Sequence, residues 1–187
     1  MNNTKSILTA IFTLFVAFSL TYSTSIYAQT ADDYQNLQKK IENIVADSEA
    51  FLEDYAEASE AGDDELLAAI KEKLKSDALS LESKYRQLTN LTKRMADDHQ
   101  STNVQAYIYL NNMSNFTDTG EKTFTQWLDA FKGFEEAIEN NNQYLYTKTR
   151  KFQMPNCVKR TNIVIEGLEK NWEKLKGVIL GDYTTDK

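Results

Sequence analysis

The chain has 187 residues, a length typical of a single domain, and carries 28 acidic against 21 basic side chains, a net charge of −7. Nucleic-acid binding favours a basic footprint, so we expect no nucleic-acid partner. Six glycines and one proline are few for an all-β fold, which needs many turns. The composition therefore predicts a small number of long helices.

The first 28 residues have the order of a secretory signal peptide. Lys5 supplies the positive start, residues 7–20 form an apolar core, and small polar residues lead to Ala28. A membrane anchor is the alternative, but a spanning helix needs about 20 apolar residues. We expect cleavage after Ala28, which leaves one domain, residues 29–187, in the periplasm or outside the cell. The mature form would not span a membrane.

Two helices with heptad spacing should follow. The first is expected from about Asp32 to Ala61, with Asp32 or Asp33 as its cap, and a turn at Gly62. Ser48 interrupts its apolar seam, which comprises Tyr34, Leu37, Ile41, Ile44, Phe51, Leu52 and Tyr55. The second helix starts at residues 63–65 and has the strongest periodicity in the chain, an unbroken heptad of Leu67, Leu74, Leu81, Leu88 and Met95. Together they predict an antiparallel hairpin.

The middle of the chain is more ambiguous. Residues 104–113 suit a helix or, by alternation, a strand; a strand would lack partners, so we favour a helix. Residues 114–122 are predicted to be a loop. A third helix is expected from about Lys122 to Asn140, with Tyr144, Leu145 and Tyr146 extending its apolar face. That face is Phe124, Trp127, Leu128, Phe131, Phe134 and Ile138.

The last helix is expected from about Asn156 to Leu180, because Pro155 should break any helix before it. Its seam has Val158, Ile165, Trp172 and Ile179 spaced by seven, with Leu168 and Leu175 beside them. None of these helices can bury its stripe alone. The fold class we predict is all-α, an up-down bundle of four, with a fifth short helix as an alternative, and with heptad-like seams.

No residue pattern predicts a metal or cofactor site. His99 is the single histidine, and a haem would need a second ligand from Met113 or Met154, because Met95 lies on the same helix. A di-metal carboxylate bundle needs Glu-x-x-His pairs, which are absent. The acidic run of residues 49–65 lacks the ligand spacing of an EF-hand, so a solvated helix face is favoured over loose calcium binding.

No catalytic constellation is present either, and we expect no enzyme activity. Cys157 is the single cysteine, so it cannot form an internal disulfide. A small buried side chain is the simpler interpretation, and an intermolecular disulfide is the alternative. The aromatic cluster around Trp127 and Trp172 is interpreted as core rather than as a ligand cage.

Charge is distributed unevenly along the chain. Ten acids and no base lie between Lys40 and Lys71, whereas residues 140–165 hold five bases and no acid. The basic stretch either complements the acidic hairpin within the molecule or meets an anionic partner or lipid head group. A partner on the acidic face should bind more weakly as salt rises.

These observations favour an exported, non-enzymatic helical bundle that acts through contacts with an as yet unknown protein partner, as a chaperone, adaptor or inhibitor would. One alternative is a carrier of a small apolar ligand, with a cavity near Trp127 and Trp172. Another is a membrane-active or self-assembling protein. Heptad seams often continue between chains, so a homodimer is included among the expectations.

Overall fold

The computed structural model describes the backbone of residues 3–60 and 64–180, and the side chains of residues 31–59 and 66–179. Its elements in chain order are the helices α1 (Asn3–Glu60), α2 (Asp64–His99), α3 (Val104–Glu139) and α4 (Gln143–Lys148), the π-helix η1 (Thr149–Gln153), and α5 (Met154–Leu180). Throughout the described backbone there is no strand, so the all-α prediction is confirmed and residues 104–113 are helical.

Two units make up the chain, residues 1–39 and residues 40–187. The first is helical from Asn3 onward. The predicted helix start at Asp32 is therefore wrong, and Asp32 and Asp33 lie inside α1 instead of capping it. No glycine or proline precedes Gly62, so the sequence contains no residue that would stop the helix earlier. The side chains of the predicted signal peptide, residues 1–28, and the predicted turn at Gly62 lie outside the described parts.

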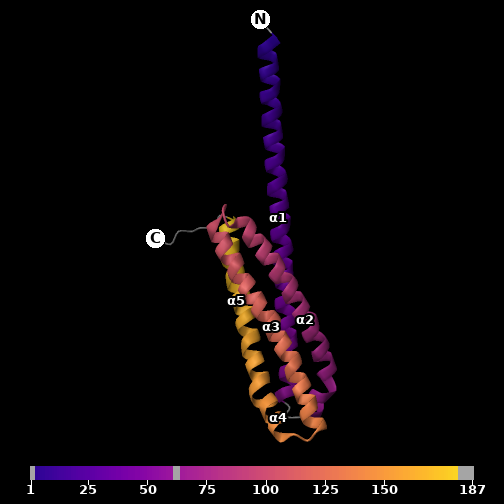
Figure 1. The fold of residues 1–187 in the computed structure, drawn as a ribbon. Coiled ribbons are helices and arrows are strands. Elements are labelled where there is room, and N and C mark those ends of the chain that lie inside the picture. Colours follow the sequence, from indigo (N-terminus) through magenta and orange to yellow (C-terminus); the bar gives the residue numbers. More distant parts are fainter. Residues whose placement is uncertain (1–2, 61–63, 181–187) are drawn as a thin grey trace, which may run out of the picture. The chain divides into compact units, whose positions relative to one another are not determined.

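The second unit is a bundle in which residues 40–60 of α1, together with α2, α3 and α5, pack against one another (Figure 1). Contacts between side chains show that successive helices are antiparallel, since rising numbers on one helix meet falling numbers on the next. The pairs are Asp47–Lys84 (2.7 Å) and Asp54–Lys73 for α1 and α2, Thr117–Thr89 (2.8 Å) and Glu135–Lys75 (3.2 Å) for α3 and α2, and Asn112–Asn171 (3.4 Å) and Trp127–Thr161 (3.2 Å) for α3 and α5.

The heptad positions of α2 form the inner face of this bundle, as their spacing predicted. Every one is buried, at 0 to 4% exposure: Leu67, Leu74, Leu81, Leu88 and Met95. Ser48, which interrupts the seam of α1, is also fully buried. Its hydroxyl lies 3.1 Å from the hydroxyl of Tyr85 on α2 and donates to the carbonyl of Ile44 at 2.7 Å. A small polar residue is therefore used where a larger apolar one would displace Tyr85.

The predicted loop at residues 114–122 is wrong, because α3 continues through it without a break. Small residues in this segment serve helix packing and not chain reversal. Thr117 is fully buried, and its hydroxyl bonds to Thr89 of α2. A Cβ added to Gly120 would overlap the ring of Tyr85, so the two helix backbones approach closely at this glycine.

Asn140, Asn141 and Asn142 do end α3. Asn140 is its C-cap, Asn141 has a positive φ of 50°, and the side chain of Asn142 caps α4 by accepting from the amide of Leu145. Asparagine tolerates this left-handed conformation better than most residues. The helix that follows is short, and Tyr144 does not extend the apolar face of α3, being 78% exposed. Ile138, predicted to be on that face, is 49% exposed.

Pro155 does not break the chain out of helical structure. The helix changes its hydrogen-bonding pattern before the proline, from α4 to the π-helix η1, and α5 begins at Met154. Proline is tolerated in the first turn of an α-helix, where its missing N–H costs least, and a π-turn lets the preceding backbone widen. The predicted start at Asn156 is thus two residues late.

Substitution of the packed glycines tests this architecture. Gly120→Ala should lower the free energy of unfolding by about 1–3 kcal/mol, because overpacking outweighs the better helix propensity of alanine. Gly167→Ala should do the same, since its Cβ would overlap the ring of Phe116. Gly177 has no atom within 4 Å of an added Cβ, so Gly177→Ala is the matched control and should be neutral or stabilising. Urea denaturation of the three variants measures the difference; equal effects would contradict the packing described.

Candidate interaction surface on α4, η1 and α5

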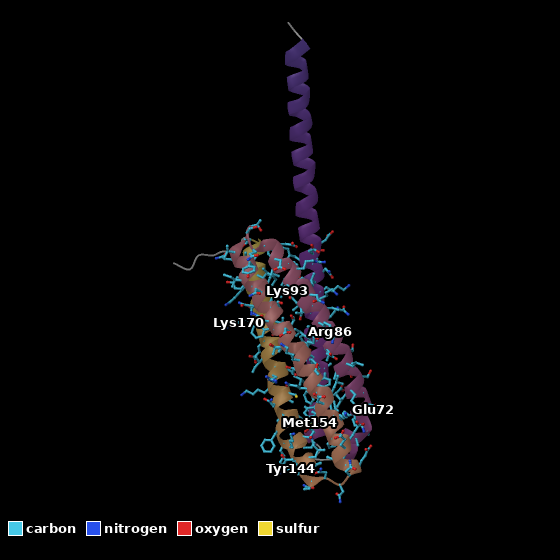
Figure 2. All side chains as sticks on the ribbon, in the orientation of Figure 1. Glu72, Arg86, Lys93, Tyr144, Met154 and Lys170 are labelled. Carbon is cyan, nitrogen blue, oxygen red and sulfur yellow. The ribbon has the colours of Figure 1, made fainter. Side chains whose placement is uncertain are left out.

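The most unusual surface among the described residues is a basic and apolar strip along the outer side of α4, η1 and α5. We call it the α5 face, and it comprises Tyr144, Lys148, Lys151, Phe152, Lys159 and Ile163. Its three apolar side chains are 78%, 67% and 47% exposed for Tyr144, Phe152 and Ile163 respectively. Figure 2 shows Tyr144 at the α4 end of the bundle. Large apolar side chains exposed beside charges are typical of contact surfaces.

The local helix geometry explains why these side chains point outward. The inward positions of the segment are taken by Thr149, Met154, Cys157 and Thr161, which are all buried. Thr149 donates to the side chain of Gln153 at 3.1 Å, across the π-turn. The residues beside and between these anchors, Lys148, Lys151, Phe152 and Lys159, are exposed on the outer side of the segment.

The five bases of the stretch are used in two ways. Arg150 and Arg160 are held by their own molecule: Arg150 bonds to Ser59 of α1 at 3.2 Å and lies 5.9 Å from the ring centre of Phe134, and Arg160 bonds to Gln126 at 2.6 Å. The three lysines, Lys148, Lys151 and Lys159, are exposed and form no ion pair with any side chain that the structure describes. The two arginines are therefore held by uncharged groups of their own molecule, and the three lysines have no acidic partner among the described side chains.

The other half of α5 carries both charges on its outer side. Glu166, Glu169 and Glu173 are exposed there, and so are Lys170 and Lys174. Between this half and α1 lies a groove of about 520 Å³, lined by apolar Ile41, Val45, Ala46 and Trp172, by Glu42, Glu49, Glu169 and Glu173, and by Lys176. The first half of α5 is thus basic and apolar on its outer side, whereas the second half is mixed in charge, and its Glu173 is paired with Lys176 at 2.5 Å. The sequence showed the acid-free stretch, but it did not show which of its residues would be exposed.

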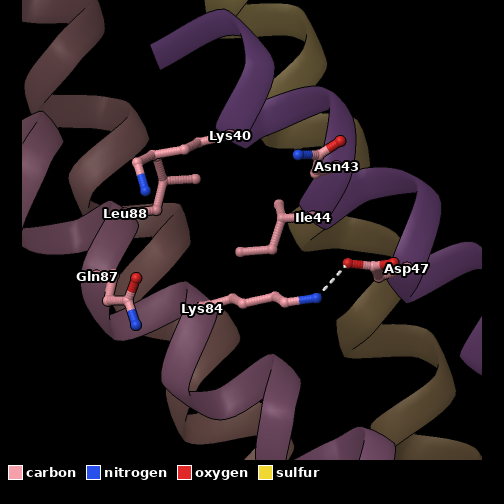
Figure 3. Close-up of a pocket in the computed structure, with 7 residues that line it drawn as sticks. All are labelled: Lys40, Asn43, Ile44, Asp47, Lys84, Gln87 and Leu88. Carbon is pink, nitrogen blue, oxygen red and sulfur yellow. Dashed lines mark hydrogen bonds and ion pairs between the residues drawn. The ribbon is translucent and has the colours of Figure 1, made fainter. Parts of the chain in front are cut away.

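The grooves elsewhere on the bundle have a different character. Figure 3 shows one of about 400 Å³ between α1 and α2, which the 2.7 Å ion pair between Lys84 and Asp47 crosses. The apolar side chains beneath it, Ile44 and Leu88, are 2% and 1% exposed. A groove of about 260 Å³ between α3 and α5 is lined by polar side chains together with Cys157. Neither offers an exposed apolar surface to a partner.

The aromatic cluster predicted around Trp127 lies in the core. Trp127 is fully buried and its ring packs against those of Phe51, Tyr55 and Phe131, with centroids 4.7 to 5.6 Å apart. Trp172 makes no ring contact with this cluster in the described part of the chain and instead borders the α1–α5 groove. A ligand beside Trp127 would have to separate the packed rings, whereas one beside Trp172 would not.

The histidine and methionines are far from forming a shared site. His99 ends α2, next to the α2–α3 connection. Met154 is the first residue of α5 and lies level with the opposite end of α3, about 45 Å from His99 at the usual helical rise. Met95 and Met113 are buried in the core. Within the described side chains, no group of three or more His, Cys, Asp or Glu residues is placed to hold a metal ion. Nor does any helix in the searched residues have the length and apolar character needed to cross a bilayer.

Cys157 is 2% exposed. Burial raises the pKa of its thiol from 9.0 to about 11, against a smaller lowering by Arg160. The thiol is therefore protonated at neutral pH, and a protonated thiol is a poor nucleophile.

Comparison with known proteins adds no relative. No protein-family model, no curated protein and no solved structure matches the chain. The geometry and charge of the chain's own surface are therefore what indicate its function.

The buried thiol gives a prediction about pH. Because the folded pKa of Cys157 is raised, its contribution to stability is complete below pH 9 and is lost as pH rises to 11, by about 1–3 kcal/mol. Urea denaturation across this range should show the loss in the wild-type chain. Cys157→Ala should remove this part of the pH dependence, whereas an unchanged slope in the variant would assign the loss to other groups.

Proposed function

We propose that this chain is an exported, non-enzymatic helical bundle that works by binding a protein partner on the α5 face. The observation that carries the proposal is that exposed apolar groups lie on one strip with three lysines that form no ion pair with a described side chain. The complementary partner is a surface with carboxylates around apolar side chains. Charge complementarity would steer its approach, and burial of Phe152, Tyr144 and Ile163 would supply binding energy.

A protein partner fits this strip better than a flat anionic membrane. Arg150 bonds to Ser59, so the end of α1, which carries the exposed Glu53 and Glu57, lies next to η1. Carboxylates on this part of α1 and a net charge of −7 for the chain both oppose an anionic membrane. A contoured protein surface can contact the lysines and avoid the glutamates. Membrane activity thus stays an alternative that the binding experiment below also tests.

The carrier hypothesis is the second proposal, and the groove beside Trp172 is the place it would use. That groove is lined by four glutamates, so it suits a cationic ligand better than the apolar one first expected. We therefore rank it below protein contact.

Binding of an acidic probe tests the proposed face. A fluorescent helical peptide with alternating Glu and Leu faces should bind the exported chain at low salt, and at least about tenfold more weakly near 0.5 M NaCl. The triple variant Lys148→Glu, Lys151→Glu and Lys159→Glu should lose binding. Its matched control carries the same change in net charge on α2 and α3: Lys93→Glu, Lys122→Glu and Lys132→Glu. Fluorescence anisotropy measures both.

Equal losses in the two triple variants would show attraction by net charge alone and would contradict a defined face. Sedimentation with vesicles of anionic lipid gives the other comparison. If the vesicles bind with the same dependence on Lys148, Lys151 and Lys159 and the peptide does not, a membrane is the partner and the protein-contact proposal fails.

Export gives a separate prediction. Expressed in its own host, the protein should be recovered outside the cytoplasm with Gln29 as its first residue, because the cleavage site follows Ala28. N-terminal sequencing and intact mass are sufficient measurements. Recovery in the cytoplasm, or in membranes with residues 1–28 still attached, would contradict the predicted signal peptide.

A further inference from the structure

We infer that the groove between α1 and α5 is a second docking surface, and that its occupant is an α-helix of another protein with lysines or arginines on both sides of an apolar stripe. The inference goes beyond the proposed function, because the groove shares no residue with the α5 face and takes a partner of the opposite charge. It rests on the shape of the groove, on its apolar floor and on the charge of its rim.

The groove runs along two antiparallel helices of the bundle. Ser59, near the end of α1, bonds to Arg150 just before α5 begins, whereas Val45, earlier on α1, shares the groove with Trp172 near the end of α5. On α1 the lining positions extend over residues 41–49, about 12 Å at the usual rise and therefore about two helical turns. A third helix laid between two others would repeat the kind of packing that holds the bundle together.

The floor of the groove is apolar. Ile41, Val45 and Trp172 form it, at 2%, 8% and 6% exposure, and Ala46 beside them is exposed. The small alanine leaves room for a side chain of the partner, and tryptophan is enriched among the residues that dominate binding energy at protein contacts. The groove is also larger than the one between α1 and α2, at about 520 Å³ against about 400 Å³.

The ion pair in this groove lies along one helix. In the α1–α2 groove, Lys84 of α2 reaches across to Asp47 of α1 at 2.7 Å. In the α1–α5 groove, Lys176 is paired with Glu173 at 2.5 Å, three residues earlier on the same helix. An apolar stripe of a partner can therefore reach the floor without separating Lys176 from Glu173.

The rim of the groove is acidic on both helices. Glu42 and Glu49 of α1 and Glu169 and Glu173 of α5 are exposed, and with Lys176 as the one base among the lining residues, four acids against one base give −3. Carboxylates on both sides of an apolar floor match a helix with cations beside its stripe. Lysine and arginine can lay their methylene groups on apolar surface and keep their charge at the rim. An anionic helix would be repelled.

The bases closest in sequence do not line the groove. Lys40 lines the α1–α2 groove, and Lys174 lies 5.8 Å from the centre of an aromatic ring of α3. At about 100° per residue, Lys39 and Lys170 are about 90° and 110° around their helix axes from the middle of the lining positions. The acidic character of the rim is therefore kept on both helices.

A basic helical peptide tests the groove. A fluorescent peptide with lysines on both sides of a leucine stripe should bind the exported chain at low salt, and at least about tenfold more weakly near 0.5 M NaCl. The same peptide with two prolines at its centre cannot form a continuous helix and should bind at least about tenfold more weakly. Fluorescence anisotropy measures both. Equal affinity of the two peptides would show that a flexible basic chain is sufficient and would overturn the inference, as would no binding of either.

Charge reversal tests the rim. Glu49→Lys combined with Glu169→Lys changes one carboxylate on each side and should weaken binding of the helical peptide at least about tenfold. The matched control, Glu57→Lys combined with Glu139→Lys, makes the same change in net charge at two exposed glutamates outside the groove and should weaken binding much less. Equal losses would show attraction by net charge alone and would overturn the inference.

An uncharged substitution tests the floor. Ala46→Gln places a longer side chain in the groove and should weaken binding at least about tenfold, whereas Ala69→Gln, at an exposed alanine of α2, should leave the affinity unchanged. Both alanines are exposed, so the two variants should keep the circular dichroism of the wild-type chain. Unchanged affinity of Ala46→Gln would show that the peptide is not seated on the floor and would overturn the inference.

The outcomes for the two surfaces can be told apart. The triple variant of Lys148, Lys151 and Lys159 should bind the basic peptide no more weakly than the wild-type chain. If the acidic peptide binds and the basic peptide does not, the inference fails and the proposed function stands. If only the basic peptide binds, the inference stands and the proposed function fails.

Discussion

Close contact between α2 and α3 at Gly120 is the constraint on which the packing of the bundle depends. The ring of Tyr85 occupies the space that a side chain at position 120 would need, and it stacks on Phe124 with centroids 5.5 Å apart. The hydroxyl of the same tyrosine reaches Ser48 on α1 at 3.1 Å, and burial raises its pKa to about 12. One side chain therefore connects three helices, and its hydroxyl stays protonated and paired. A larger residue at Gly120 would move α3 and break this arrangement.

The same device recurs on the other side of α3, which explains why this helix is central to the bundle. Phe116 of α3 lies against Gly167 of α5, as Tyr85 lies against Gly120. Further along α3, after both glycine contacts, Phe124, Trp127 and Phe131 point into the core and are fully buried. Helix α3 thus has a small residue where it meets α2, large residues toward the centre, and a phenylalanine that packs on the glycine of α5. The close packing of α3 against α2 explains why threonine and glycine occur in a segment that is nevertheless helical.

The close packing between helices also explains which parts of the fold could be predicted from the sequence. The Leu67-to-Met95 heptad was sufficient for α2, because a strict period of seven has one helical interpretation and every member is buried. The loop predicted for residues 114–122 was wrong because Thr117 and Gly120 are, in the sequence alone, typical turn residues. Their role depends on Thr89 and Tyr85, which are distant in sequence. The helix break predicted at Pro155 was wrong for a similar reason, since the π-helix η1 that precedes the proline has no signature in the sequence.

For the candidate surface, the sequence supplied the charges and the structure supplied their exposure. The acid-free stretch from Asn140 to Ile165 is visible in the sequence. The sequence does not show that Arg150 turns to Ser59 while Lys151 and Phe152 turn outward. The difference depends on burial, because Thr149 and Met154 fix which side of the segment faces the core. At about 100° per residue, Tyr144, Lys148, Lys151 and Lys159 fall within about 80° of one another even around a regular helix axis, so their spacing places them on one side. The burial of Thr149 and Met154 decides that this side is turned away from the core, and it is there that a partner is proposed to bind.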